Sequence, residues 1–139
     1  MISQHFYLPD YDWEIYSFYA INEYPVDDII GTLEDCNCSS SDYNKIYTFI
    51  NQAGYNTGLT YTNNIEGVSI MVIGPTTSAD EFQNTFDHEK GHLVSHIASA
   101  LDIDPYSEEY QYLSGEIGQK LFKKAHIFLC ERCRKYLLF

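Results

Sequence analysis

Residues 86–97 read Phe-Asp-His-Glu-Lys-Gly-His-Leu-Val-Ser-His-Ile and contain the pattern H-E-x-x-H. On an α-helix, residues four apart lie on one face about a turn from each other, so His88 and His92 can reach one metal ion together. Glu89 projects roughly 100° around the helix from His88. It therefore flanks the ion without binding it, where a carboxylate acts as general base on metal-activated water. The pattern predicts one Zn²⁺ ion bound by His88 and His92, with Glu89 as the catalytic residue.

The histidine pair lacks one ligand, because a catalytic zinc ion usually has three protein ligands and a water molecule. His96 rises roughly 12 Å along a straight helix from His88, so we assign it to the packing surface or to hydrogen bonds around the site. The better candidates are acidic residues of the next predicted helix, which are Glu108, Glu109 and Glu116. Glu108 is preferred, because it shares a helix face with two glycines that let helices approach closely. Glu109 is the second choice and Glu116 the third.

The helix that presents these residues has a start signal and a buried side. Residues 76–80, Thr-Thr-Ser-Ala-Asp, offer several N-cap side chains. Its apolar residues recur at helical spacing and are Phe82, Phe86, Leu93, Ile97, Ala100 and Leu101. Gly91 costs roughly 1 kcal/mol against alanine in a helix, so its presence predicts close packing at that point. The helix is expected to end before residues 102–105, because the residue before a proline resists helical geometry.

The rest of the chain predicts a small sheet and further helices. Strands are expected at 12–20, 58–62 and 68–73, the last two forming a hairpin around the turn at 63–67. Helices are expected at 26–35, from Ser40 or Ser41 to near Gly54, from Ser107 onward, and over 125–139. This order indicates an α+β fold with a small antiparallel sheet and segregated helices. The strand at 68–73 is the expected open edge that could pair with an extended substrate.

Composition excludes several classes of protein. The 139 residues include 45% hydrophobic and 20% charged residues, which indicates one folded globular domain over 1–139. The formal net charge is −12, so the overall field repels nucleic acid. No apolar run approaches the roughly 20 residues of a membrane span, and no secretory signal is visible. We therefore expect a cytoplasmic protein; its oligomeric state is left open.

The four cysteines form two pairs, Cys36-Asn-Cys38 and Cys130-Glu-Arg-Cys133. Together they could bind a second, structural zinc ion through four thiolates. The alternative is four reduced thiols, which is usual in the cytoplasm. A third hypothesis is a metal-binding module built on the cysteines, in which the H-E-x-x-H pattern occurs by chance.

The segment from Phe86 to His96 resembles the H-E-x-G-H-x-x-x-H signature of the ImmA/IrrE type of zincin metallopeptidase, including the extra histidine. In that family a glutamate opens a helix of the form E-x-x-A-x-x-F-A, and Glu108-x-x-Gln111-x-x-Ser-Gly is similar in spacing. The chain also resembles short zincin-like proteins carried by phages and mobile elements of gut bacteria. Both resemblances rest mainly on residues 68–121. They imply a zincin-like domain, with its metal-site half there, made in a bacterial host.

Pattern and resemblance together predict a zinc-dependent metallopeptidase that hydrolyses a peptide bond. His88, His92 and one of Glu108 or Glu109 would hold the ion, and Glu89 would take a proton from the attacking water and give it to the leaving amine. The expected partner is a protein or peptide substrate. The alternative is a non-catalytic, zinc-binding protein of phage type, with a structural or host-interaction role on the same fold.

Overall fold

The computed structural model describes residues 1–22, 26–52 and 58–138. These residues form four strands, five α-helices and two short 3₁₀ helices. In chain order the elements are β1 (Ile2–Leu8), β2 (Trp13–Tyr19), α1 (Val26–Asp35), α2 (Ser40–Gln52), β3 (Leu59–Asn63), β4 (Val68–Ile73), α3 (Ala79–Ala100), α4 (Glu108–Ala125), a 3₁₀ helix (His126–Leu129), α5 (Glu131–Arg134) and a second 3₁₀ helix (Lys135–Leu138). No described helix has the length and apolar character that a membrane crossing requires.

The sheet is mixed, with the strand order β1-β2-β4-β3. β1 pairs with β2 and β3 with β4 in antiparallel fashion, whereas β2 and β4 run parallel. The predicted all-antiparallel sheet is therefore wrong at one pairing, because α1 and α2 carry the chain back before the second hairpin and let its inner strand align with β2. The predicted open edge is also wrong. Every residue of β4 is buried, since the strand lies inside the sheet, and the edges are β1 and β3.

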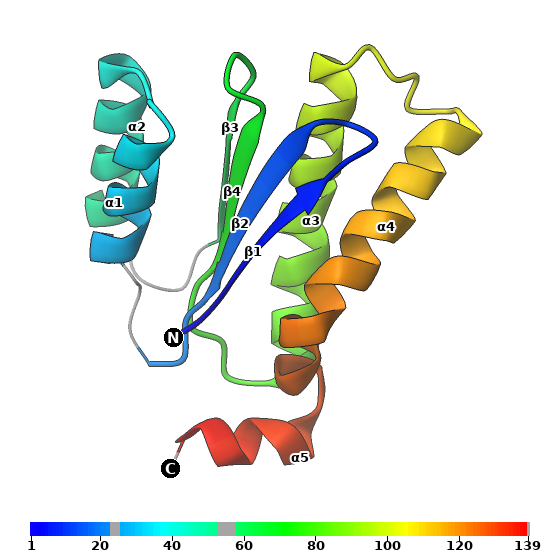
Figure 1. The fold of residues 1–139 in the computed structure, drawn as a ribbon. Helices are drawn as coiled ribbons and strands as arrows, with labels where there is room; N and C mark the ends of the chain where they lie inside the picture. Colours follow the sequence, from blue (N-terminus) through cyan, green and yellow to red (C-terminus); the bar gives the residue numbers. More distant parts are fainter. Residues whose placement is uncertain (23–25, 53–57, 139) are drawn as a thin grey trace.

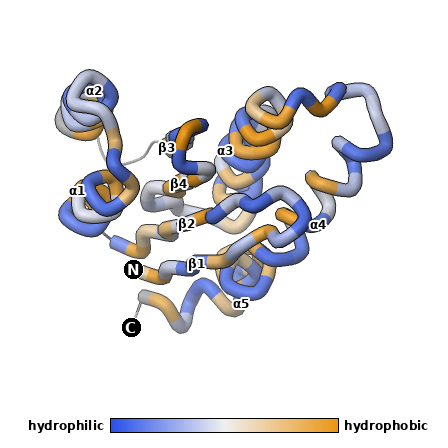
Figure 2. Tube along the Cα trace, turned by 45° about the horizontal axis from the view of Figure 1, so that its top comes forward, coloured by the Kyte–Doolittle hydropathy of each residue, from blue (hydrophilic) through white to orange (hydrophobic). Residues whose placement is uncertain are grey.

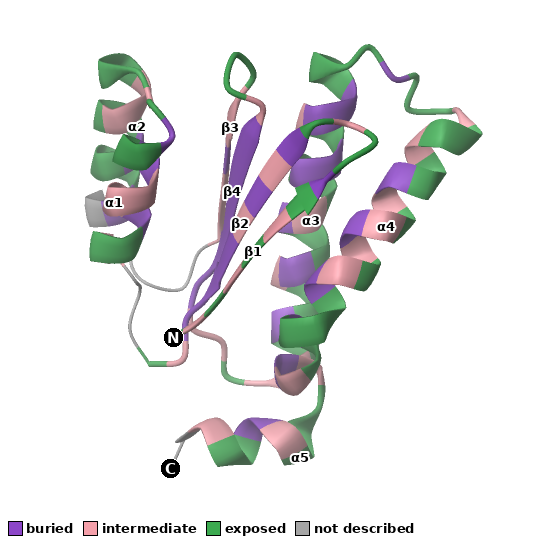
Figure 3. Cartoon of the chain, viewed as in Figure 1, coloured by how far each residue is buried: buried purple, intermediate pink, exposed green. Residues whose placement is uncertain are grey.

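The fold is α+β, as predicted. The predicted segregation of the helices is wrong, because helices cover both faces of this sheet (Figure 1). Along β4, Met71 and Ile73 pack in one core with α3 and α4, while Ile70 and Val72 pack in a second core with α1 and α2. This alternation follows from the two-residue period of a strand. Figure 3 shows β4 buried throughout, between helices whose outer sides are exposed. In Figure 2 hydrophobic and hydrophilic residues alternate along the helices, as expected for amphipathic helices.

The helix with the H-E-x-x-H pattern forms where the sequence predicts it. Ser78 is its N-cap and accepts a hydrogen bond from the backbone N–H of Glu81 at 3.2 Å. Most of the predicted apolar stripe is buried, but Ala100 and Leu101 at the helix end are exposed. A residue with positive φ, Asp102, follows the helix, and the next helix begins after its N-cap Ser107. The starts of both helices of this hairpin could therefore be predicted from their N-cap residues.

Two stretches differ from the expectation. β1 was not predicted, because Gln4 interrupts its apolar face and only Leu8 is fully buried. Residues 125–139 do not form one helix; within the described part they break into two 3₁₀ helices and the short α5. α2 ends at Gln52, and the predicted end near Gly54 lies outside the described residues.

Candidate functional site

The imidazoles of His88 and His92 converge on the exposed side of α3. Their Nε2 atoms lie 3.2 Å apart, and the two rings are inclined at 79°. Two imidazole nitrogens that each lie about 2.0–2.1 Å from one tetrahedral zinc ion are about 3.3–3.4 Å apart. The observed separation therefore fits two ligands of one ion, as the spacing of four residues predicts.

Glu89 points to a different side of the helix and is buried between α3 and β3, with 6% of its surface exposed. Its Oε2 accepts a hydrogen bond of 2.6 Å from the Thr60 hydroxyl. The same hydroxyl lies 3.1 Å from the backbone carbonyl oxygen of Glu89, so it approaches both the side chain and the main chain of this residue. β3 thus fixes the carboxylate that the sequence predicts as the base.

Gly58, just before β3, makes room for this carboxylate. A Cβ atom at position 58 would lie 2.5 Å from Cγ and 2.9 Å from Oε1 of Glu89. Both distances are shorter than real contacts of a Cβ atom. A glycine is therefore required here for Glu89 to keep its observed position.

His96 is held one step further along the same strand. Its Nδ1 lies 3.0 Å from the hydroxyl of Thr62, which in turn lies 2.8 Å from the hydroxyl of Ser69. The indole N–H of Trp13 donates to that serine at 3.0 Å. Burial lowers the pKa of His96, the nearby His92 lowers it further, and Glu89 opposes the shift. His96 therefore belongs to a hydrogen-bonded chain that runs from α3 through β3 and β4 to β2.

Thr60 and Thr62 share one face of β3 because they are two residues apart, and this face meets α3. Both threonines also line a cavity of about 340 Å³ between α2, β3 and α3. The other lining residues are Asp42, Tyr61, Asn64, His96 and Ser99. Sequence reasoning missed these threonines, although Thr-x-Thr on a predicted strand already places two hydroxyls on one face.

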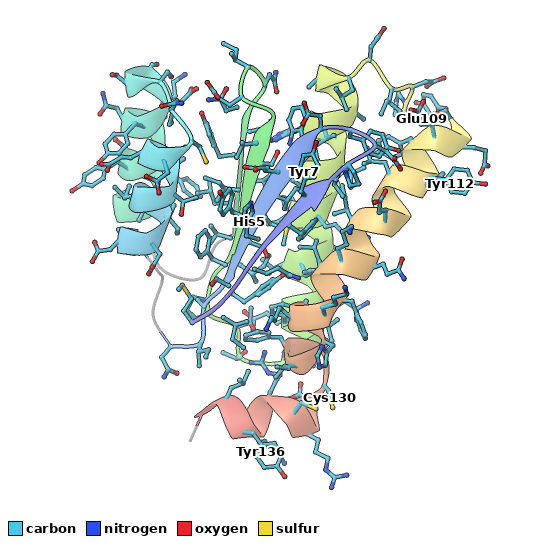
Figure 4. The ribbon with its side chains drawn as sticks, in the orientation of Figure 1. His5, Tyr7, Glu109, Tyr112, Cys130 and Tyr136 are labelled. Atoms are coloured by element: carbon cyan, nitrogen blue, oxygen red, sulfur yellow. The ribbon has the colours of Figure 1, made fainter. Side chains whose placement is uncertain are left out.

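Glu108 and Glu109 are exposed in the first turn of α4, where the ribbons of α3 and α4 diverge (Figure 1), although the Tyr110 hydroxyl of this turn lies 3.3 Å from that of Ser95. Figure 4 shows Glu109 at the start of α4. The two helices approach lower down, where a Cβ atom at Gly118 would lie 3.2 Å from Nζ of Lys90. In the described part of the chain, no three His, Cys, Asp or Glu side chains come together at a metal-binding distance. The structure therefore brings the two histidines together without either glutamate.

Glu109 and Glu116 lie instead toward the turn between β1 and β2. Burial raises the pKa of the Tyr11 hydroxyl there, and the charges of Glu109 and then Glu116 raise it further. Both glutamates thus face the β-hairpin, and this orientation follows from the helical wheel, because Leu113 and Ile117 must be buried against the core.

The two cysteine pairs also lie apart. Cys36 and Cys38 belong to the core formed with α1 and α2, on one face of the sheet. Cys130 precedes α5 and Cys133 lies within it. This short helix is hydrogen-bonded to the start of α3 and to the segment before it. The tetrathiolate site that the sequence left open is therefore not formed, because the fold separates its two halves.

The site combines a converging histidine pair, a buried carboxylate held by a strand hydroxyl, and a neighbouring polar cavity. Known proteins offer no guide to it. No family model matches this chain, and no curated protein or solved structure matches it. The chemistry of the site therefore follows from its own side chains.

Proposed function

We propose that this protein is a zinc-dependent metallopeptidase in which His88 and His92 bind the ion and Glu89 is the general base. The observation that carries the proposal is the 3.2 Å separation of the two Nε2 atoms, which suits a single tetrahedral ion. Zinc, when bound, supplies a Lewis acid that polarises a carbonyl group and lowers the pKa of water toward about 7. The remaining steps fall to side chains of the chain itself.

Glu89 moves the proton in this scheme. Its Oε2 is engaged by the Thr60 hydroxyl at 2.6 Å, so Oε1 is the atom that accepts a proton from water and later returns it to the leaving amine. A Cβ atom at position 58 would lie 2.9 Å from Oε1, so a glycine is needed where the chain passes this oxygen. Thr60 acts as a positioning residue, because it limits the rotation of the carboxylate without touching the substrate.

The third protein ligand remains the prediction made from the sequence, with Glu108 preferred over Glu109. Either residue can join the histidines only if the first turn of α4 approaches α3 when metal binds. We expect Glu108→Gln to weaken zinc affinity by about 10-fold or more if it is a ligand, whereas Glu109→Gln then leaves the affinity unchanged. The reverse pattern would assign the ligand to Glu109.

A second candidate function is a non-catalytic zinc-binding protein with a structural or host-interaction role. The observation in its favour is that Glu89 is buried with only 6% of its surface exposed and hydrogen-bonded to Thr60, while the described residues supply only the histidine pair. In that case Glu89 ties α3 to β3 and has no reaction to catalyse. Peptide turnover separates the two candidates.

The experiment is cleavage of a peptide library by the zinc-loaded protein, compared with the variants Glu89→Gln and Glu81→Gln. Glu81 is an exposed glutamate on the same helix and provides the matched control. If the protein is a peptidase, we expect the cleavage rate to fall by at least about 100-fold in Glu89→Gln and to stay unchanged in Glu81→Gln. Zinc binding without any cleavage by the wild-type protein would support the non-catalytic candidate.

A further inference from the structure

The cavity between α2, β3 and α3 lies where the sheet ends. β3 is an edge strand, with α2 packed on one face of the sheet and α3 on the other (Figure 1). Beyond this edge the two helices are no longer separated by a strand of the described sheet, so Asp42 of α2 and His96 and Ser99 of α3 line one space of about 340 Å³. Asn64 and Ser99 are exposed, so the cavity is open to solvent. Its volume suits a small ligand or a single side chain.

The side chains around this cavity favour a ligand that donates hydrogen bonds. Each of the seven lining residues has a side-chain atom that can accept a hydrogen bond, and none is limited to donation, as a lysine or arginine would be. Thr60 donates its one hydroxyl proton to the carboxylate of Glu89 at 2.6 Å. Toward a ligand in the cavity, the Thr60 oxygen can therefore only accept.

Asp42 determines the charge of the cavity. It is half-buried and is the only acidic residue of the lining, which contains no lysine or arginine. The one ion pair found in the described part of the chain joins His5 and Glu14, so no cation there neutralises Asp42. Asp42 lies in the first turn of α2 and Ser99 in the last turn of α3. These helix ends carry opposite partial charges of about half an elementary charge, which offset each other, so the full charge of the carboxylate remains and favours a cation.

A guanidinium group matches this lining better than a metal ion does. Ca²⁺ and Mg²⁺ need several oxygen ligands, whereas no three His, Cys, Asp or Glu side chains of the described residues come together at a metal-binding distance. A guanidinium group is planar, stays charged and has five N–H donors, two of which can pair with one carboxylate. Its other donors match the oxygen atoms of Thr60, Asn64 and Ser99, which lie around the same cavity.

We propose that the cavity between α2, β3 and α3 binds a guanidinium group, with the carboxylate of Asp42 as its counter-ion. The group belongs to a free small molecule or to an arginine side chain of a peptide, which present the same chemistry to the cavity. Binding needs neither a metal ion nor the histidine pair. If a peptide supplies the group, its arginine lies one hydroxyl away from Glu89, and a role for it in cleavage then rests on the proposed function.

The test titrates the full chain with propylguanidinium, in the presence of a metal chelator, and follows the backbone amide resonances by NMR. We expect saturable shifts centred on Thr62, Asn64 and Ser99, with a Kd of about 1 mM or lower. Propylurea has a similar shape without the charge and should not bind. Propylammonium should bind at least about 3-fold more weakly, because its three donors cannot form the paired bonds to a carboxylate. Equal affinity for propylammonium would overturn the assignment to a guanidinium group.

Two variants of the lining test the position of the ligand. Asp42→Asn removes the charge with little change of shape and should weaken binding by at least about 10-fold. Asp27→Asn removes the same charge from an exposed position in the first turn of α1 and should leave the Kd unchanged. Ser99→Leu keeps the charge and fills part of the cavity, so it should also weaken binding. Circular dichroism confirms that each variant is folded.

A capped pentapeptide with one arginine among alanines distinguishes the two sources of the group. Tighter binding of this peptide than of propylguanidinium assigns the cavity to a peptide side chain, and equal or weaker binding assigns it to a free small molecule. The proposal is overturned if neither probe binds, if the shifts lie outside the cavity, or if Asp42→Asn binds propylguanidinium as tightly as Asp27→Asn. None of these results depends on zinc binding or peptide cleavage.

Discussion

Replacing Thr60 with valine keeps the shape of the side chain and removes the hydroxyl that holds Glu89. The hydroxyl bonds a carboxylate with only 6% of its surface exposed, at 2.6 Å. Hydrogen bonds to charged groups contribute about 1.5–3 kcal/mol, and a buried acceptor left unpaired adds its desolvation cost. We therefore expect Thr60→Val to lower the free energy of unfolding by about 2 kcal/mol. Urea denaturation at neutral pH measures this change directly, from the shift of the midpoint at constant m-value.

The chain offers a matched control in Thr77, whose hydroxyl lies 2.5 Å from the carboxylate of Glu81, with both residues exposed. Water replaces a lost partner at such a site, so Thr77→Val should cost less than about 1 kcal/mol. Thr60→Ser keeps the hydroxyl and should also cost less than about 1 kcal/mol. If Thr60→Val is no more destabilising than Thr77→Val, the buried hydrogen bond does not hold Glu89 in the way proposed.

Further predictions concern the space beside Glu89, the start of α3 and the anchor of α5. Gly58→Ala should destabilise by about 1–3 kcal/mol in urea, because its new Cβ atom would overlap Glu89, and peptide cleavage should fall with it. Hydrogen bonds from the hydroxyl and the backbone N–H of Thr77 lower the pKa of Glu81, so its contribution to stability is complete above the ordinary pKa and is lost as pH falls through the lowered value. Glu81→Gln should therefore flatten the acid side of the stability profile, measured by urea titrations at several pH values, and an unchanged slope would refute the assignment. Arg134→Met should lower the free energy of unfolding by about 1–3 kcal/mol, because two hydrogen bonds to the segment before α3 are lost. Calorimetry would detect this change as a lower melting temperature.

The order of the central elements could be predicted because local signals specify it. Ser78 and Ser107 both act as the N-caps of the helices that follow them, and the alternating or continuous apolar runs mark β2 and β4. The parallel pairing of β2 with β4 could not be predicted in this way. It depends on how the crossover through α1 and α2 returns the chain, and neither strand carries a local signal for its neighbour.

The candidate site shows the same division between local and long-range information. The spacing of His88 and His92 within one helix specifies their convergence, which the structure reproduces. The position of Glu108 depends on the angle between α3 and α4, and small residues on one helix face do not determine that angle. The bond from Thr60 joins residues 29 positions apart and depends on sheet register. Contacts of this kind become visible only when the strands and helices are placed together.

The most direct test of the proposed zinc site is the metal content of the purified protein after equilibration with zinc and dialysis. We predict about one zinc ion per chain for the wild-type protein and for His126→Ala, whose histidine is exposed at the end of α4. We predict loss of the bound ion in His88→Ala and in His92→Ala, with unchanged circular dichroism. Zinc that remains bound in both of these variants, or a wild-type protein that binds none, would contradict the account.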